Sequence, residues 1–256
     1  MKVVILAGGY GTRLSEETSI RPKPMVEVGG KPILWHIMHC YAKYGHKDFV
    51  ILAGYKAEYI RSYFLNYHQQ NSDFTINTST GNISWSRSDL EDWNVTVLDT
   101  GLDTMTAGRV KRARDVIGEE RFFLTYGDGV TDLNVDDLLD FHEKSGNLLT
   151  LTAVTQPGRF GALGLSEDKT RVTAFKEKAA DGGGLINGGY FVVEPEVYDL
   201  IDDDTTVWEE EPVDRLVEMD KLGSYHHRGF WQNMDTLREK QKLEDMWASG
   251  EAPWKR

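Results

Sequence analysis

Apolar runs and amphipathic segments alternate along the chain from its first residues. Apolar runs bounded by polar residues or glycine predict strands at 2–7, 48–53, 94–99, 121–126, 148–155 and 185–193. Between them, apolar side chains recur at helical spacing over 32–44, 56–68, 134–145 and 236–249. Strands that feed helices in this order predict an α/β fold, in which helices cover both faces of a mostly parallel sheet.

Two stretches depart from this alternation. Residues 74–88 are mostly polar and predict a hairpin that turns at Gly81 and Asn82. Residues 161–178 predict shorter antiparallel strands around residues 167–169. Neither a repeat nor a low-complexity linker divides the chain, so we expect residues 1–256 to form one domain.

The composition is that of an ordinary globular protein with an excess of acidic residues. Hydrophobic residues make up 40% and charged residues 27% of the chain, and the formal net charge is -12. This charge argues against a nucleic-acid-binding surface or an anionic-membrane surface. Binding of small anionic ligands stays possible, because it depends on the charge near the binding site rather than on the net charge. The segment that carries Arg13, Arg21, Lys23 and Lys31 is such a local basic exception.

The cysteine and histidine positions favour a reducing compartment and no metal bound by these residues. Cys40 is the one cysteine, which excludes a disulfide framework, and its helical register with Ile33 and Ile37 predicts a core position. The apolar start is too short for a signal sequence, and no stretch approaches the ~20 apolar residues of a membrane helix. We therefore expect a cytoplasmic protein. His36 and His39 lie one helical turn apart, but no third ligand follows at a suitable spacing.

A glycine-rich loop directly follows the first predicted strand. Its sequence is Ala7-Gly8-Gly9-Tyr10-Gly11-Thr12-Arg13-Leu14. The three glycines let the backbone bend tightly and turn its amides toward a ligand, and such a row of N–H groups binds anions. Arg13 and the nearby Lys23 add two cations at the same place. The combination predicts a site for the triphosphate of a nucleotide.

Two better-known phosphate motifs do not fit this loop. A dinucleotide-binding fingerprint needs a third glycine where Leu14 stands. A Walker loop around Gly30 and Lys31 needs glycine at Met25 and serine or threonine at Pro32. The glycine loop is therefore a different kind of phosphate site.

Two aspartates are candidate ligands of Mg²⁺, which prefers carboxylate, phosphate and water oxygens. Asp128 follows the strand at 121–126 and stands between two glycines, where a turn aspartate is the alternative. Asp235 precedes the last predicted helix, where an N-cap residue is the alternative. Ligands of open parallel sheets bind beyond the carboxyl ends of the strands. The glycine loop and Asp128 both follow such ends, so we expect them to share one site.

Further candidate residues flank the later strands. Glu177 and Lys178 follow a strand-like run and could hold a sugar hydroxyl and a phosphate, or form a solvated edge pair. Asn187 and Gly188 interrupt a predicted strand, which often marks a close approach of the backbone to a ligand. Gly161 is a similar position.

Several segments resemble one known family. GGYGTRL, RPKPM, VEVGGKPILWHI, YGDG, FKEK, NGGYF and WQNMDT are similar in order and spacing to motifs of the sugar-1-phosphate nucleotidyltransferases, across nearly the whole chain. Within that family the likeness is greatest to members that use CTP, and Glu16 in the SEET segment supports this. The resemblance implies a Rossmann-like mixed, mostly parallel sheet flanked by helices, of the nucleotide-diphospho-sugar transferase type, with small antiparallel insertions.

The resemblance also implies an activity and its partners. CTP and α-D-glucose 1-phosphate would give CDP-glucose and pyrophosphate, with Mg²⁺ as cofactor and the sugar phosphate attacking the α-phosphorus in line. Thymidylyl or uridylyl transfer on the same scaffold is the alternative within this class. A nucleotide-sugar sensor without turnover is the alternative outside it. The subgroup implies a homohexamer and a place in bacterial O-antigen (lipopolysaccharide) synthesis, without a nucleic-acid or membrane partner.

The matched motifs imply a role for each candidate residue. Roughly, residues 1–130 would hold the nucleotide and residues 131–256 the sugar phosphate. Arg13 and Lys23 would be catalytic, with Arg13 on the departing pyrophosphate and Lys23 on the α-phosphate, while Asp128 and Asp235 would hold Mg²⁺. The implied nucleotide-binding set is Leu6, Ala7, Gly8, Gly9, Tyr10, Gly11, Thr12, Arg13, Lys23, Thr104, Arg109 and Asp128, and the sugar-phosphate set is Gly161, Glu177, Lys178, Asn187 and Gly188.

Overall fold

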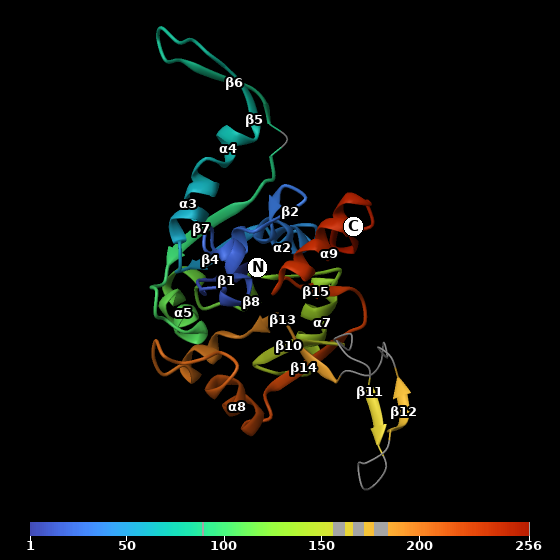
Figure 1. The fold of residues 1–256 in the computed structure, drawn as a ribbon. Coiled ribbons are helices and arrows are strands. Elements are labelled where there is room, and N and C mark those ends of the chain that lie inside the picture. Colours follow the sequence, from blue (N-terminus) through green and yellow to red (C-terminus); the bar gives the residue numbers. More distant parts are fainter. Residues whose placement is uncertain (89, 156–161, 166–171, 177–183, 256) are drawn as a thin grey trace.

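The computed structural model describes residues 1–88, 90–155, 162–165, 172–176 and 184–255. One central sheet contains, in spatial order, β14 (Leu222–His227), β10 (Leu149–Thr155), β13 (Leu185–Val193), β8 (Phe122–Tyr126), β1 (Lys2–Ala7), β4 (Asp48–Ala53) and β7 (Asn94–Asp99). β13 runs antiparallel to its neighbours β8 and β10, whereas the other strands run parallel to one another. The predicted α/β fold with a mixed, mostly parallel sheet is confirmed (Figure 1).

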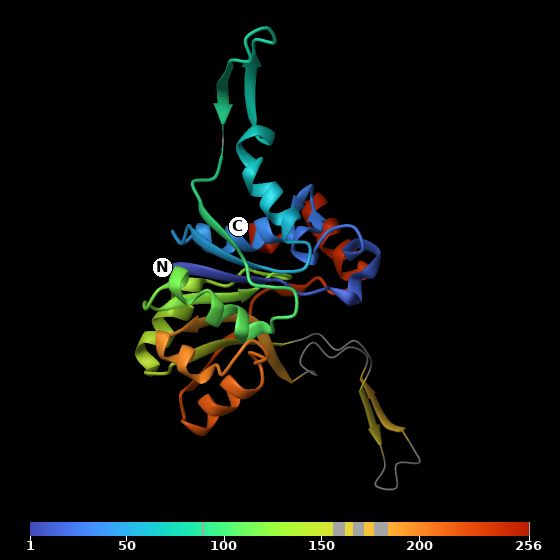
Figure 2. The ribbon, with the colours of Figure 1, turned by 90° about the vertical axis from the view of Figure 1, so that its left-hand side faces the viewer.

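The inner strands are apolar because both faces of the sheet are buried there. In β1, Val3 and Ile5 pack into one core and Val4 and Leu6 into the other, as successive side chains of a strand point to opposite faces. The helices divide between these cores on the two sides of the sheet (Figure 2). The first core includes side chains of α2 (Ile33–Ala42), α3 (Ala57–Leu65), α7 (Val135–Ser145) and α9 (Leu237–Ala248), and the second those of α5 (Thr106–Arg112), α6 (Arg114–Ile117) and α8 (Glu211–Glu218).

Most of the predicted elements occur within two residues of their expected bounds. The predicted helix at 56–68 is wrong in one respect, because α3 ends at Leu65 and a separate short helix, α4 (Tyr67–Gln70), follows Asn66. Asn66 leaves the helical region with ψ near 0°, which ends the first helix. The helix α8 was not predicted. None of the helices in the described ranges is long and apolar enough to cross a membrane.

Two short strand pairs lie near the site, and one of them brings distant segments together. β9 (Gly129–Thr131) pairs antiparallel with β15 (Trp231–Asn233), and the Met234 N–H donates to the carbonyl oxygen of Asp128 at 2.8 Å. This pairing places Asp128 beside Asp235. β2 (Glu27–Val28) and β3 (Lys31–Pro32) form a second pair, shortly after Lys23.

Both predicted antiparallel insertions are present. β5 (Ser72–Ile76) and β6 (Ile83–Ser88) form the first, and Gly81 in its turn has a φ of +76°. Figures 1 and 2 show this hairpin projecting from the body of the molecule beyond α4. β11 (Ala162–Leu165) and β12 (Val172–Lys176) form the second pair, and residues 167–169, predicted at its turn, lie outside the described residues.

Candidate active site

The loop after β1 forms one wall of a cavity of about 620 Å³ at the carboxyl end of the parallel strands. Residues that follow β7 and β8, together with the segment before α8, complete the wall. The structure therefore gathers every residue of the predicted nucleotide set around one cavity. These are Leu6, Ala7, Gly8, Gly9, Tyr10, Gly11, Thr12, Arg13, Lys23, Thr104, Arg109 and Asp128.

Gly11 sets the bend of this loop. Its φ of +64° lies in the left-handed region, and a Cβ there would stand 2.8 Å from the Thr18 side chain and 3.1 Å from Lys23 Cβ. The hydroxyl of Thr18, in α1 (Ser15–Thr18), contacts the carbonyl oxygens of Gly11 and Leu14, each at 3.0 Å. The loop is thus bent by glycine, held by Thr18 and packed against Lys23.

Arg109 holds the glycine loop in place through hydrogen bonds to backbone carbonyl oxygens. Its side chain reaches the carbonyl oxygens of Gly8 at 3.2 Å, Ala53 at 3.3 Å and Gly101 at 2.7 Å, and the Thr100 hydroxyl at 2.8 Å. These acceptors lie at the ends of β1, β4 and β7 or just beyond them. Burial lowers the pKa of Arg109 from its usual value, and the positive charge of Arg112 adds to this effect. Arg109 lines the cavity as predicted, and its observed contacts fix the three loops relative to one another.

Gly8 is a glycine because Arg109 lies directly against it. A Cβ on Gly8 would stand 2.2 Å from the Arg109 guanidinium, far inside van der Waals contact. A Cβ on Gly9 would meet nothing within 4 Å. The two adjacent glycines therefore differ: the first admits the arginine, and the second leaves space on the cavity side.

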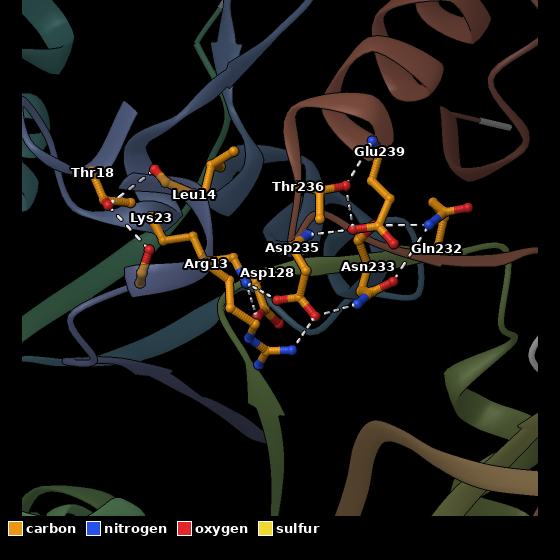
Figure 3. Close-up of polar contacts among 11 residues, drawn as sticks. Arg13, Leu14, Thr18, Lys23, Asp128, Gln232, Asn233, Asp235, Thr236 and Glu239 are labelled. Atoms are coloured by element: carbon orange, nitrogen blue, oxygen red, sulfur yellow. Dashed lines mark hydrogen bonds and ion pairs between the residues drawn. The ribbon is translucent and has the colours of Figure 1, made fainter. Parts of the chain in front are cut away.

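Lys23 lies between two carboxylates at the end of the loop (Figure 3). Its Nζ is 2.6 Å from Asp128 Oδ2 and 2.5 Å from Asp235 Oδ1. Burial alone would lower the pKa of Lys23, but the Asp128 and Asp235 carboxylates outweigh it and raise the pKa above its usual value. Lys23 therefore carries its charge at any physiological pH.

The Asp235 carboxylate also contacts Arg13 and Asn233. Arg13 contacts Asp235 Oδ2 at 2.7 Å, and the Asn233 amide donates to the same oxygen at 2.7 Å (Figure 3). The Arg13 side chain is 75% exposed, so it remains free to contact a ligand, whereas the Asp235 side chain is only 9% exposed. One buried carboxylate thus holds both predicted catalytic cations.

The capping role that the sequence left open for Asp235 falls to its neighbour. Thr236 is the N-cap of α9, and its hydroxyl accepts from the Glu239 N–H at 3.3 Å. The Glu239 carboxylate accepts from the Asp235 N–H at 2.8 Å, one residue before the N-cap that a capping box would use, and this arrangement leaves the Asp235 side chain facing Lys23.

The residues present suit a hard divalent cation. Asp128 and Asp235 converge on a single ammonium, so a cation in that place would meet a carboxylate from each. No group of three or more His, Cys, Asp and Glu side chains in the described ranges could hold a metal. Two carboxylates suit Mg²⁺, which is usually bound by one or two carboxylates together with substrate phosphates and water.

The predicted sugar-phosphate residues are only partly within the described ranges. Gly161, Glu177 and Lys178 lie outside the described residues. Asn187 reaches the cavity indirectly, since its side-chain amide is 3.4 Å from the hydroxyl of Tyr126, a residue of the cavity wall. Gly188 packs against β10, and its carbonyl oxygen accepts from the Trp231 indole at 2.7 Å.

Residues that the sequence had not marked also line the cavity. They come from the segment after β7, from the end of β8 and from the loop before α8, and include Leu102, Asp103, Thr106, Tyr126, Val207 and Glu209. Tyr126 belonged to the YGDG motif, which was a usable signal. Glu209 begins a run of three glutamates that is typical of a solvated surface, so the sequence gave no signal for this residue.

Comparison with known proteins agrees with the geometry. A family model described as "Nucleotidyl transferase" matches residues 2–234. The glucose-1-phosphate cytidylyltransferase of Salmonella typhi is 52% identical over 256 residues, which cover 100% of this chain and 99% of that protein. A Bacillus subtilis protein named "Probable glucose-1-phosphate cytidylyltransferase" is 43% identical, with the same coverage. The crystal structure of HddC from Yersinia pseudotuberculosis has the same fold, with a TM-score of 0.70, 23% identity, and 96% of this chain and 99% of that chain covered.

Proposed function

The chain belongs to the nucleotidyl transferase family, and from this premise we propose that it is a glucose-1-phosphate cytidylyltransferase. It transfers the cytidylyl group of CTP to α-D-glucose 1-phosphate and releases CDP-glucose and pyrophosphate. Full-length identity of 52% to a relative that bears this name supports the choice of substrates. The observation that carries the proposal is the meeting of Arg13, Lys23, Asp128 and Asp235 at the end of the glycine loop.

The reaction needs orientation and charge compensation rather than a protein nucleophile. A phosphate oxygen of the sugar phosphate forms a bond to the α-phosphorus, and the bond from the α-phosphorus to the bridging oxygen of pyrophosphate breaks. The attacking group is already an anion, so no side chain has to remove a proton. The protein accordingly acts by positioning the two substrates and by stabilising the charge that spreads over the phosphates.

Each residue of the cluster has a part in that stabilisation. The amides of the loop at 8–13 face the triphosphate, and the exposed Arg13 contacts the departing pyrophosphate. Lys23 contacts the α-phosphate and the attacking phosphate. Asp128 and Asp235 would hold Mg²⁺, which neutralises triphosphate charge when it is bound. Arg109 keeps the loop in place through the carbonyl oxygen of Gly8.

The two halves of the domain divide the substrates between them. The half at 1–130 holds CTP, and the half at 131–256 holds glucose 1-phosphate. In the second half, Asn187 and Gly188 lie on β13 next to Tyr126, which supports a sugar site on this side of the cavity. Gly161, Glu177 and Lys178 complete the proposed sugar-phosphate set.

Pyrophosphate release tests the proposed reaction. The chain is mixed with glucose 1-phosphate, Mg²⁺ and, in separate assays, CTP, UTP or dTTP. Fastest release with CTP is the expected result, and a preference for dTTP or UTP would instead assign the alternative base. Tight nucleotide binding without release in any assay would favour a sensor.

We further propose that the protein is a homo-oligomer, a hexamer by family resemblance, with the hairpin β5–β6 as a contact. The cross-strand pairs Phe74–Trp85 and Ile76–Ile83 put four apolar side chains on one face of the hairpin, and each is between 41% and 52% exposed. No charged residue occurs in 74–86, so a second copy with the same net charge of -12 meets no repulsion there.

Sedimentation tests this contact. Trp85→Ser should reduce the assembly, whereas Thr75→Ser, a change of one methyl group on the other face of the hairpin, should not. A monomeric wild type would exclude the oligomer, and an unchanged Trp85→Ser assembly would exclude the hairpin as its contact. Cytoplasmic location and a supply of CDP-glucose for O-antigen synthesis complete the proposal, and the buried free thiol of Cys40 supports a reducing compartment.

A further inference from the structure

A row of polar side chains crosses the cavity away from the Lys23 cluster. The Thr106 hydroxyl, at the start of α5, donates to Glu209 Oε2 at 3.3 Å, and the Tyr126 hydroxyl donates to Glu209 Oε1. The Asn187 amide then lies 3.4 Å from the Tyr126 hydroxyl. The row thus joins residues of the proposed nucleotide half and the proposed sugar half, and Glu209 lies between Thr106 and Tyr126.

The row is held in place by the core beneath it. Trp208, directly before Glu209, is fully buried and packs edge-on against Phe191, and Tyr126 packs edge-on against the same ring. Gly189 has a φ of +76°, and a Cβ there would stand 2.3 Å from the Tyr126 ring. The Tyr126 ring therefore lies directly against the backbone of β13 at Gly189, and Glu209 follows an anchored residue.

The directions of these hydrogen bonds follow from their donors. The backbone N–H of Trp208 donates to the Thr106 hydroxyl oxygen at 2.7 Å. The hydroxyl proton of Thr106 is therefore directed to Glu209. Burial, reinforced by the Glu209 carboxylate, raises the pKa of Tyr126, so its phenol keeps a proton to donate. Each carboxylate oxygen of Glu209 accepts one protein hydroxyl and retains a further lone pair.

The remaining lone pairs determine which part of a ligand can lie against Glu209. An ionised carboxylate only accepts hydrogen bonds, and it repels phosphate, so the ligand must present donors here. The two oxygens of one carboxylate match a pair of adjacent hydroxyl groups on a sugar ring. Both proposed substrates carry such pairs, on the ribose of the nucleotide and on the hexose.

We propose that Glu209 is a specificity-determining residue that accepts hydrogen bonds from adjacent hydroxyl groups of a sugar ring, with Tyr126 and Thr106 holding its carboxylate in place. The proposal deepens the proposed function and rests on it for the identity of the sugars. The recognised chemistry, a pair of ring hydroxyls, is common to ribose and glucose, and the two arms of the experiment separate them.

Calorimetric dissociation constants test the proposal without requiring turnover. The ribose arm compares CTP with 2′-deoxy-CTP and 3′-deoxy-CTP, and the hexose arm compares CDP-glucose with its 2-deoxy and 3-deoxy analogues. In the wild type, loss of a hydroxyl that contacts Glu209 should raise Kd by about 10- to 100-fold, as expected for a hydrogen bond to a charged group. In Glu209→Gln, that penalty should shrink several-fold in the same arm.

Two further variants separate recognition from structure. Tyr126→Phe removes one hydroxyl that holds Glu209 and should reduce the same penalty, although less. Glu210→Gln is the matched control, because it removes an adjacent exposed glutamate that is not in the cavity wall. It should bind every ligand as the wild type does. Circular dichroism establishes that each variant is folded.

The outcomes are distinct from those of the proposed reaction. A reduced penalty in the ribose arm or in the hexose arm supports the proposal and identifies the sugar. Unchanged penalties in both arms, or an equal effect of Glu210→Gln, would overturn it. Failure of the proposed reaction appears separately, as a wild type that binds ligands but releases no pyrophosphate.

Discussion

Replacing Lys23 with methionine tests the carboxylate cluster through stability as well as activity. Methionine has a similar length but no charge, so Asp128 and Asp235 would lose their shared counter-ion. Removal of one partner from a buried ion pair costs about 3–5 kcal/mol, because it leaves an uncompensated charge. Arg13 still pairs with Asp235, and the Asp128 side chain is 31% exposed, so solvent and Arg13 replace part of the contact. We expect a loss of about 2 kcal/mol.

Thermal unfolding measures that loss, and added Mg²⁺ identifies its cause. For a chain of this size the melting temperature should fall by about 4–8 °C. Mg²⁺ should restore most of it in the variant, since a ligand of the native state at ten times its Kd adds about 1.4 kcal/mol. The wild type should gain less, because Lys23 competes for the same carboxylates. Turnover should still fall at least ~10²-fold, on the scale of losing a charge-stabilising donor.

The control is Lys47→Met, which removes a surface lysine whose partner, Asp92, is 97% exposed. It should melt within about 1 °C of the wild type, because exposed pairs contribute little. The reasoning is refuted if Lys23→Met melts like this control, or if Mg²⁺ raises the melting temperatures of variant and wild type equally.

Three further predictions concern Asp128, the glycine loop and the buried His36. Asp128→Asn should raise the Mg²⁺ concentration needed for half-maximal turnover by about 10-fold, as loss of a charged ligand implies, and a titration that overlays the wild type would exclude Asp128 as a ligand. Gly8→Ala should lower the melting temperature and weaken CTP binding, because Arg109 must move to admit the new Cβ. Gly9→Ala should leave the melting temperature unchanged, since a Cβ there meets nothing. Equal melting temperatures of the two variants would contradict the packing of Arg109 against Gly8. Burial lowers the pKa of His36 to about 4, so the native state holds fewer protons there than the unfolded chain, and stability should fall by about 3 kcal/mol as the pH drops from 6.5 to 4. Urea unfolding across that range measures the loss, and His36→Gln should show a shallower dependence; an identical slope would reject this role.

Most of the central sheet was predictable because its inner strands are buried on both faces, whereas the edge strand β14 is only partly buried and was not among the predicted strands. The continuous apolar run of β1 needs no alternation to be recognised, since its side chains enter a core on either side. The helix α8 was missed although Val213, Leu216 and Val217 recur at helical spacing, because its eight residues are fewer than the about 11–18 over which such a period is recognised. The site residues of the glycine loop were predictable for another reason. Its glycines and cations lie close together in the sequence, so a short segment shows the phosphate site.

Contacts that depend on tertiary structure were not predictable. Sequence could not decide between a cap and a ligand for Asp235, since either kind of residue can precede a helix. Only the observed capping of α9 by Thr236, with Glu239, shows that the Asp235 carboxylate is available to Lys23. Most contacts of Arg109 are to backbone carbonyl oxygens that follow or end three strands, and any residue type can supply a carbonyl oxygen, so the sequence does not reveal them. Glu209 was hidden because its partners, the Thr106 and Tyr126 hydroxyls, come from α5 and β8, far from it in the sequence.

The most direct test of the central claim is pyrophosphate release from CTP and glucose 1-phosphate by the wild type and Lys23→Ala, with UTP and dTTP in parallel. We predict that the wild type releases pyrophosphate fastest with CTP and forms CDP-glucose, and that the folded Lys23→Ala variant is slower by at least ~10²-fold. A wild type that releases no pyrophosphate with any of the three nucleotides, or a folded Lys23→Ala variant with a near-normal rate, would contradict it.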